Sequence, residues 1–550
     1  MAMKGRSKVD FDWITADFEA VIPATGRSRQ SRPGLWQIAE YQTQQFSGKL
    51  AVANPDSRPP EIRIALPLKE TYDLFFGMQE EFCDRIKVKL ASDRAFDRLC
   101  HSRHLAKSQG AFQEVFWRTA TLDGKETLII RQDPGLRVSL GFVAARRAKV
   151  GPEPLAKKDY LLHITDDGFP GNWGAPEDDE DAVWQVEPCA RLGVDIISLG
   201  TNIAGMANYP TRHDSLRIPT SEMLKETFPA SVYEIAWRNM ADDARAGRNV
   251  PRRYFALAKE NGMRTFAYAR MAHLHCSPPY DAFRSEFFDA HPEFRCIDID
   301  GVPVNRLSIA FPEVRLEYIK LFAECVELGA DGINAVFVRG LPLVLYEEPV
   351  REAFRKRHGK EIIDLPENEP SAQAMRAEFV TAYMREQREA MQEAGRGRKI
   401  AIMAIVPATK DVCDFFGFDI ARWVKEGLVD ILCPYRWGVD ASDVALEMDF
   451  FCAAVRDTRV QLLPFINAVS VKDPVDFLER AIALCKWPID GLSVWDAILR
   501  GPGFYDAFRN LGSLDAMRET IERLKAGPRH HHVRTLNGVK NDKYHFGWAL

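Results

Sequence analysis

Four acidic residues stand where buried runs of the sequence end. Asp166 and Asp496 each follow an apolar run directly, and Glu347 and Glu348 come shortly after a third run ends at Arg339. Hydrolysis of a glycosidic bond normally needs two carboxylates, because one protonates the leaving oxygen and the other attacks carbon or activates water. We expect Glu347 or Glu348 to be the general acid. Asp496 or Asp166 would then be the base or nucleophile, and Arg339 would orient a carboxylate or hydroxyl of the substrate.

Polar and aromatic residues accompany these carboxylates at the ends of the same runs. Such a set suits a polyhydroxylated ligand, because carboxylates and amides bind hydroxyl groups and indole faces pack on the apolar side of a sugar ring. The arginines among them favour an acidic saccharide, since guanidinium groups pair well with carboxylates. The predicted substrate-binding residues are Asp167, Asn202, Arg270, His273, His275, Arg339, Tyr435, Arg436, Trp437, Asn467 and Trp495.

Several of these residues also have a purely structural explanation. Glu347 and Glu348 stand before a proline, where acidic residues often begin a helix. Asp166 and Asp167 stand before a glycine, which fits a turn equally well. Trp495, like the other tryptophan of the binding set, would also serve as packing in a barrel wall.

The elements that must position these residues are apolar runs that alternate with amphipathic helical stretches beyond residue 150. Strands buried on both faces and separated by helices are typical of parallel β/α units, and eight such units close into a barrel with its active site at the strand carboxyl ends. We therefore predict an α/β fold, a (β/α)8 TIM barrel over residues 151–550 with a C-terminal extension. Asp331 precedes its strand and is expected to order the opposite end of the barrel. The predicted strands are Tyr160–Thr165, Asp195–Gly200, Thr265–Arg270, Ile333–Arg339, Ile400–Val406, Ile431–Tyr435, Gln461–Ile466 and Leu492–Trp495.

Residues 1–150 show a different pattern, in which short alternating runs are broken by turn residues. Ile62–Ala65, Tyr72–Gly77 and Val138–Ala144 are examples of these runs. The pattern favours an N-terminal antiparallel β-sandwich domain that precedes the barrel. Such a domain can bind carbohydrate through exposed rings such as those of Trp36 and Trp117, although core packing is the favoured interpretation for both.

The composition argues against several classes of function. The chain has 550 residues and a formal net charge of −5, so it lacks the broad basic field that nucleic-acid binding requires. No run is long enough to cross a bilayer, and the first residues lack the apolar core of a secretory signal, so we expect a cytoplasmic protein without membrane partners. The ten cysteines form no CxxC pair, which argues against a disulfide framework or structural zinc. We predict no cofactor and a small saccharide as the partner, and the oligomeric state stays open.

A histidine pair is the basis of an alternative function. His273 and His275 lie beyond a predicted strand end, and HxH pairs in such places can bind zinc. A metal-dependent hydrolase would use them together with Asp496 after the last strand. Such an enzyme would also need histidines after the fifth and sixth strands, where this sequence has none. Metal-dependent hydrolysis therefore ranks below carboxylate catalysis, and no metal site is predicted.

Three stretches resemble a family of bacterial glycosyl-hydrolase-like proteins of the family-10 type. They are DAHPEFRCIDIDG at Asp289–Gly301, SIAFPEVRLEYI at Ser308–Ile319, and GADGINAVFVRG followed by LYEEPVREAFRKRHG, which begins at Leu345. The resemblance covers the predicted barrel, and the first 150 residues match only in general character. It implies an N-terminal β-sandwich followed by a β/α barrel that acts on glycosides.

The fourth predicted strand departs from the pattern of these relatives. In them an acidic residue, the implied nucleophile or base, stands between a DGI motif and an arginine. Here the DGI motif and Arg339 are present, but the acidic position falls on Val336 or Phe337. The seventh strand ends in Asn467 rather than in a glutamate. A barrel that binds carbohydrate without cleaving it is therefore a third hypothesis.

Overall fold

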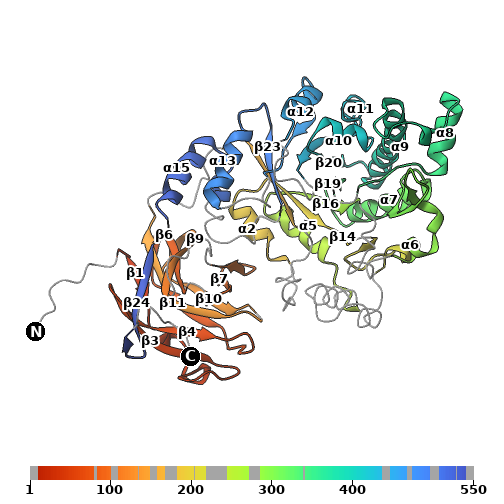
Figure 1. Ribbon diagram of the computed structural model, residues 1–550. Helices are drawn as coiled ribbons and strands as arrows, with labels where there is room; N and C mark the ends of the chain where they lie inside the picture. Colours follow the sequence, from red (N-terminus) through yellow and green to blue (C-terminus); the bar gives the residue numbers. More distant parts are fainter. Residues whose placement is uncertain are drawn as a thin grey trace, which may run out of the picture. The chain divides into compact units, whose positions relative to one another are not determined.

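The structure, a computed structural model, describes most of the chain as two compact units (Figure 1). The sheet unit comprises Met1–Lys158, Lys472–Glu479 and Ile498–Leu550, and the barrel-like unit comprises Asp159–Val471 and Arg480–Ala497. The chain thus passes from the sheet unit into the barrel-like unit and back twice. The residues described are 10–79, 83–100, 110–133, 135–148, 158–166, 183–203, 205–217, 245–271, 285–338, 341–436, 446–466, 473–495, 507–527 and 529–540.

The barrel-like unit is built on eight parallel strands in the order β22-β21-β20-β19-β16-β13-β12-β23. A parallel bridge between Phe465, just after β22, and Ser493 of β23 joins the two ends of this order, so the sheet is nearly closed. All eight runs predicted as barrel strands contribute a strand to it. The strands are β12 (Leu161–Asp166), β13 (Ile196–Gly200), β16 (Arg264–Arg270), β19 (Gly332–Val336), β20 (Ala401–Pro407), β21 (Ile431–Tyr435), β22 (Gln461–Leu462) and β23 (Gly491–Trp495).

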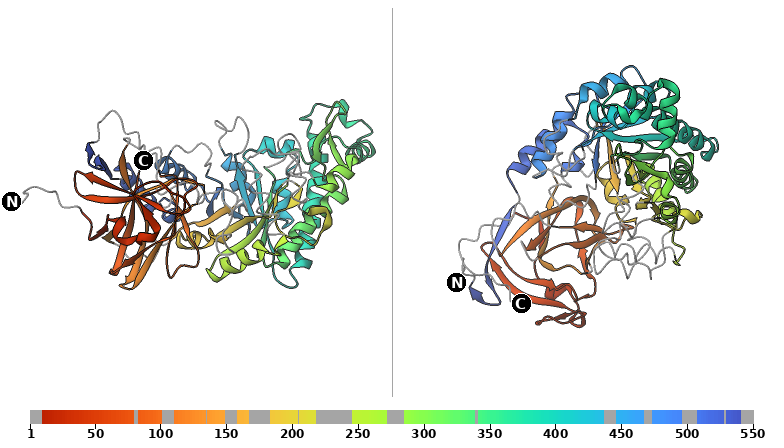
Figure 2. Two further views of the ribbon diagram at one scale, coloured as in Figure 1. Left: turned by 90° about the horizontal axis from the view of Figure 1, so that it is seen from below. Right: turned by 45° about the vertical axis from the view of Figure 1, so that its right-hand side comes forward.

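Helices follow the strands along the chain and lie outside the parallel sheet (Figure 2). The strands are buried on both faces because their inner side chains form one apolar cluster while the outer ones pack against helices. Val336 belongs to the inner cluster, whereas the ring of Phe337 lies 5.7 Å from that of Trp423 in the outer layer. No helix among the described residues is long and apolar enough to cross a membrane. The helices are α2 (Val186–Arg191), α5 (Val250–Glu260), α6 (Glu286–Ala290), α7 (Pro312–Glu327), α8 (Glu348–His358), α9 (Pro370–Ala394), α10 (Lys410–Phe415), α11 (Ile420–Lys425), α12 (Met448–Val455) and α13 (Pro474–Leu484).

A repeated aspartate orders the amino ends of the strands. Asp195, Asp331, Asp430 and Asp490 each stand just before a strand, and each carboxylate accepts a backbone N–H from the neighbouring strand. The distances between the backbone nitrogen and the carboxylate oxygen are 2.8, 3.0, 2.9 and 2.8 Å. We call this hydrogen bond the aspartate clamp, and it recurs at every second strand of the sheet. Asp331 is therefore architectural, as its place before the strand predicted.

Removing one of these clamps is expected to destabilise the fold in a pH-dependent way. Asp430 accepts from Ile402 N at 2.9 Å and from Arg388 Nη2 at 2.7 Å. Burial opposes its ionisation, but these two hydrogen bonds hold the pKa of Asp430 below its ordinary value. Asp430→Ala should lower the unfolding free energy by about 2 kcal/mol at neutral pH, because a buried N–H loses its acceptor. Denaturant unfolding would measure this loss.

A pH dependence and a second variant test this prediction. A depressed carboxyl pKa gives stability that is present above the unfolded value and lost as pH falls through the folded one. The difference between wild type and Asp430→Ala should therefore shrink as pH falls below the ordinary pKa of an aspartate. Asp430→Asn keeps an acceptor oxygen for Ile402 N and should lose less stability than the alanine variant. An equal loss in both variants at every pH would contradict the clamp.

The sheet unit contains two largely antiparallel sheets that share one hydrophobic core; in the larger sheet the short strand β2 pairs with β3 in parallel. Phe76 on β6 and Ile130 on β10 come from different sheets and belong to the same cluster. The indole N–H groups of Trp36 and Trp117 donate to Pro60 O and Asp97 Oδ2, both at 2.7 Å, and both rings are buried in that core. The strands are β1 (Trp13–Thr15), β2 (Arg27–Ser28), β3 (Trp36–Thr43), β4 (Ser47–Ala53), β5 (Ile62–Leu66), β6 (Lys69–Gln79), β7 (Ile86–Leu90), β8 (Asp97–Leu99), β9 (Ala111–Asp123), β10 (Glu126–Gln132), β11 (Val138–Arg147), β24 (His530–Leu536) and β25 (Val539–Lys540).

The C-terminal strands belong to this sheet unit. β24 pairs with both β9 and β3, and β25 pairs back on β24 as a hairpin. The sequence-based division gave residues 151–550 to the barrel, whereas Ile498–Leu550 fall in the sheet unit. The difference arises because β24 finds its partners in the first quarter of the chain, and such distant pairing leaves no local pattern in the sequence.

Candidate functional site

Four aromatic side chains gather at the carboxyl ends of the barrel-like sheet. Tyr435 and Trp495 end β21 and β23, and their rings stack at 5.4 Å with an interplanar angle of 21°. Tyr268 lies 5.8 Å from Trp495, and Phe465 lies 4.8 Å from Tyr435. We call these four residues the aromatic floor. Tyr435 is 1% and Trp495 5% exposed, so these rings pack mainly on other side chains and do not project into solvent.

A polar layer lies next along the strands, toward their amino ends. His163 on β12 contacts Ser493 Oγ at 2.9 Å through Nδ1 and Ser198 Oγ at 2.8 Å through Nε2. Asn334 Nδ2 donates to the same Ser198 Oγ at 3.2 Å. Burial lowers the pKa of His163 to about 3, so the imidazole is neutral and links strands β12, β13 and β23. No role was predicted for this group from the sequence, although Ser198, Asn334 and Ser493 are each the lone polar residue of an apolar run.

Arg436 follows the floor residue Tyr435 directly. Its guanidinium is half-buried, and its Nε and Nη2 atoms have no hydrogen-bond acceptor among the described residues. A buried guanidinium nitrogen without an acceptor is unfavourable, because the desolvation of the charge is not compensated. A ligand that brings a carboxylate or several hydroxyl oxygens to this position would provide the missing acceptors.

Asn202 and Arg270 lie at two neighbouring strand ends and bind each other through the backbone. Asn202 Nδ2 donates to Arg270 O at 3.1 Å, and Arg270 N donates to Asn202 Oδ1 at 2.9 Å. The side-chain amide of Asn202 thus adds one more hydrogen-bonded pair to the ladder between β13 and β16. The sequence predicted both as substrate-binding residues, and the structure brings them together with Asn202 committed to the backbone of Arg270.

Asp166 ends β12 and is buried. Its Oδ2 atom accepts a hydrogen bond of 2.8 Å from the hydroxyl of Tyr254, which belongs to α5 in the outer helix layer. Burial, with the Asp166 charge as the second cause, raises the pKa of Tyr254 well above its ordinary value, so the phenol stays protonated and donates. The carboxylate of Asp166 is thus hydrogen-bonded to the helix layer. The side chain of Thr165, the preceding residue of β12, lies on the other face of the sheet, because side chains alternate along a strand.

Glu347 is a buried carboxyl group of the barrel-like unit whose pKa is strongly raised. It is 1% exposed and stands at the N-cap position of α8, yet its side chain turns back from the helix. Its carboxylate accepts from Leu345 N at 3.0 and 3.1 Å and from Ile297 N at 3.2 Å, the latter at the end of β17 (Arg295–Ile297), which pairs with β18 (Pro303–Leu307). Burial raises the pKa of Glu347 to about 7 against the opposing effect of these backbone bonds.

Glu348 differs sharply from its neighbour. It is the first residue of α8, its side chain is 67% exposed, and its nearest cationic partners are Arg351 and Arg355 at 4.0 and 3.9 Å. This is the behaviour expected of an acidic residue that begins a helix. The two adjacent glutamates, which the sequence left as alternatives, therefore occupy opposite environments.

The remaining predicted site residues lie outside the described part of the chain. Within that part, no group of three or more histidine, cysteine, aspartate or glutamate side chains is arranged to hold a metal ion. The histidine pair of the metal-dependent alternative is among the residues not described. These residues are Asp167, His273, His275, Arg339, Trp437, Asn467 and Asp496.

Comparison with known proteins gives similarity only among solved structures. No protein-family model matches the chain, and no curated protein matches it. The chain is similar to the PgaB (BpsB) glycoside hydrolase domain from Bordetella bronchiseptica, with 12% identity, 65% of this chain and 99% of that chain covered, and a TM-score of 0.45.

Two further solved structures are also glycosidases. The β-galactosidase from Marinomonas ef1 shows 12% identity over 67% of this chain and 60% of its own, with a TM-score of 0.40. The α-galactosidase TtGalA from Thermus thermophilus shows 12% identity over 87% of this chain and 92% of its own, with a TM-score of 0.36. At these values the likeness assigns no activity to the present chain.

Proposed function

We propose that the barrel-like unit is a (β/α)8 barrel glycoside hydrolase that acts on a small acidic oligosaccharide at the carboxyl ends of its strands. The proposal is supported by the aromatic floor and by Arg436, which follows the floor residue Tyr435 in the sequence and has two guanidinium nitrogens without an acceptor among the described residues. An aromatic surface suits the apolar side of a sugar ring, and a guanidinium suits the carboxylate of a uronic acid. The two together favour an acidic sugar over a neutral one.

The general acid of this proposal is Glu347. A carboxyl group whose pKa is raised to about 7 is still largely protonated near neutral pH and can donate a proton to a leaving oxygen. Glu348, with a side chain that is 67% exposed, lacks the buried environment of Glu347. Of the two glutamates that follow Arg339, Glu347 is therefore the one suited to acid catalysis.

The base or nucleophile of this proposal is Asp496. It follows Trp495 of the aromatic floor directly in the sequence, at the end of β23. Asp166, the other candidate, is bound by the hydroxyl of Tyr254 in the helix layer, which favours a structural role for it. Binding of substrate hydroxyl groups is assigned to the polar residues that follow the other strands, as the sequence predicted.

The test is a panel of aryl glycosides and aryl uronides assayed with the full chain. We expect turnover of one or more uronides, and Arg436→Ala should lower their kcat/KM by about 10- to 100-fold, because a charge-assisted hydrogen bond contributes roughly 1.5 to 3 kcal/mol. Arg436→Lys keeps the charge but loses the planar fork and should recover only part of the loss. An equal loss on neutral glycosides would contradict carboxylate recognition by Arg436.

A second candidate function is carbohydrate binding without cleavage. It is favoured by the hydrogen bonds that already engage the two described acidic candidates at buried positions, Asp166 with Tyr254 and Glu347 with two backbone N–H groups. In that case an oligosaccharide should raise the thermal unfolding temperature of the protein and survive long incubation intact. Release of a smaller sugar from the same compound would exclude this candidate.

A further inference from the structure

The C-terminal strand β24 occupies a slot between two strands from the beginning of the chain. Its first residues, His530–His532, pair with β9, and Val533–Leu536 pair with β3. Because β3, β4, β11, β6 and β9 are already joined in that order, β24 connects the last of them to the first and closes the sheet on itself. In Figure 1, β24 is the blue strand among the red and orange strands of the sheet unit.

The contacts that hold β24 are short on both sides. Its ladder with β9 covers three residues, and its ladder with β3 is interrupted by a register shift between Val533 and Thr535. In contrast, the ladder of β6 with β9 extends from Lys69 to Gln79, with one register shift between Leu74 and Phe75. Strands held by few backbone bonds open at a lower free energy than those held along their length. β24 is therefore held by short ladders on both of its sides, whereas β4, whose ladder with β11 is equally short, pairs along Gln37–Gln42 of β3 on its other side.

Specific side chains define where β24 docks. Val533 is fully buried in the cluster that includes Tyr41 and Phe112, and it is the only buried hydrophobic residue that β24 contributes among the described residues. His531 Nε2 lies 2.7 Å from Glu114 Oε1 on β9, and both side chains are buried. His532 and Arg534 are exposed on the opposite face. One apolar and one polar anchor thus fix the register of the strand.

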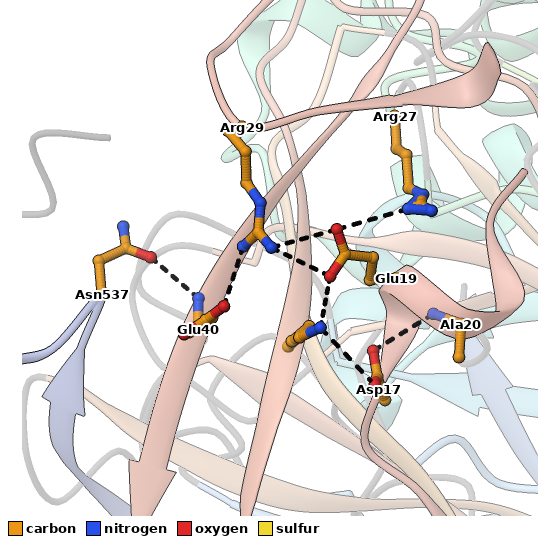
Figure 3. A network of polar contacts seen from close by, with 8 residues as sticks. Asp17, Glu19, Ala20, Arg27, Arg29, Glu40 and Asn537 are labelled. Carbon is orange, nitrogen blue, oxygen red and sulfur yellow. Dashed lines mark hydrogen bonds and ion pairs between the residues drawn. The ribbon is translucent and has the colours of Figure 1, made fainter. Parts of the chain in front are cut away.

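The hairpin end of the segment has its own attachment. Asn537, at the turn between β24 and β25, donates from its backbone N to Glu40 O at 2.6 Å and accepts from Glu40 N at 2.9 Å through Oδ1. Figure 3 shows that Glu40 in turn joins Arg29, which binds Glu19. Arg29 and Glu40 are largely solvent-exposed, so the ion pair between them contributes little to the stability of this attachment.

We propose that the slot between β3 and β9 is a strand-binding site, which opens and closes on the segment of residues 529–540 while the rest of the sheet stays folded. The occupant is this segment of the same chain. Gly527 follows α15 (Leu514–Lys525) and has a left-handed backbone with φ of 74°, as glycine commonly does where a helix ends. An open slot exposes two unpaired strand edges, and such edges bind extended peptides readily.

Hydrogen exchange on the intact full chain is the first test. The backbone amide of Val533, which donates to Gly110 O at 3.0 Å, should exchange at least about 10-fold faster than amides in the middle of β6 and β11, because undocking of β24 leaves those strands paired. Exchange of β24 amides at the same rate as β6 and β11 would overturn the proposal, since the strand would then open only when the whole sheet unfolds.

Peptide capture by full-length variants is the second test. Val533→Asp places a charge at the buried anchor and should open the slot, so this variant should bind a labelled peptide of residues 529–540. The wild-type chain should bind it at least about 10-fold more weakly, because its tethered strand competes at millimolar effective concentration. Arg534→Asp is the matched control, since it makes a charge change on the exposed face of the same strand and should leave the slot closed.

The outcomes of this second test are distinct. Capture of the wild-type peptide by Val533→Asp, together with failure to capture a peptide that carries the same substitution, supports a specific strand site. A folded Val533→Asp chain that binds neither peptide overturns the proposal. If that variant does not fold, the exchange rates of the wild-type chain decide the question alone.

Discussion

Glu347→Gln is expected to lower kcat on a uronide substrate by about 10²- to 10⁴-fold, the usual contribution of a positioned general acid. Glutamine has nearly the same shape and can still accept a backbone hydrogen bond, but it cannot donate a proton to the leaving oxygen. Burial raises the pKa of Glu347 to about 7, so the wild-type rate should fall as pH rises through that value. The kcat of the variant should not fall in this way as pH rises through the same value.

Glu348→Gln is the matched control for this prediction. The two residues are adjacent, but the Glu348 side chain is 67% exposed and faces only distant arginines of α8. Its substitution should change kcat by less than about threefold, because exposed ion pairs of this kind are weak. Equal effects of the two substitutions, or a wild-type rate that does not respond to pH near 7, would remove Glu347 from the catalytic role.

The raised pKa of Glu347 also predicts a change in stability with pH. A carboxyl group that is harder to ionise in the folded protein makes the fold less stable as pH rises from the unfolded value of 4.5 toward about 7. Glu347→Gln removes this titration, so its unfolding free energy should vary less with pH over that interval. This measurement needs no substrate and is independent of the proposed reaction.

The eight strands of the barrel-like sheet were predictable because each is a local apolar run bounded by turn residues. Burial on both faces leaves a pattern that one strand carries by itself, as in the fully buried run of β20. The clamp at Asp331 was predictable for the same reason, since its place before a strand fixes the end of the sheet at which it lies. In each case, information within about ten residues was enough.

The environments of Glu347 and Glu348 were not predictable in this way. Both precede Pro349, and the local pattern gives both the same prospect of starting a helix. What separates them is the backbone of Ile297, fifty residues earlier, whose N–H reaches Glu347 but not Glu348. The closing strand β24 escaped prediction for a similar reason, because its partners lie at the other end of the chain.

Glu324→Ala is expected to destabilise the barrel-like unit by about 3 kcal/mol, because several buried donors share this one carboxylate. Glu324 belongs to α7 and is 7% exposed. Its oxygens accept from Tyr209 Oη at 3.0 Å, from Thr211 Oγ1 at 2.6 Å and from Arg212 N at 3.0 Å. The segment that contains these donors follows β13 and packs on α7 through them. Denaturant unfolding would measure the loss.

Glu327→Ala provides the control on the same helix, since Glu327 also binds Arg212 but is 29% exposed. It should cost less than about 1 kcal/mol, as exposed ion pairs do. The segment held by Glu324 begins beside Asn202, whose amide extends the pairing of β13 with β16 at the candidate site. Glu324→Ala should therefore also raise KM for the uronide while the pH dependence set by Glu347 stays unchanged. A shift of that pH profile in Glu324→Ala would mean that the segment acts on the acid rather than on substrate binding.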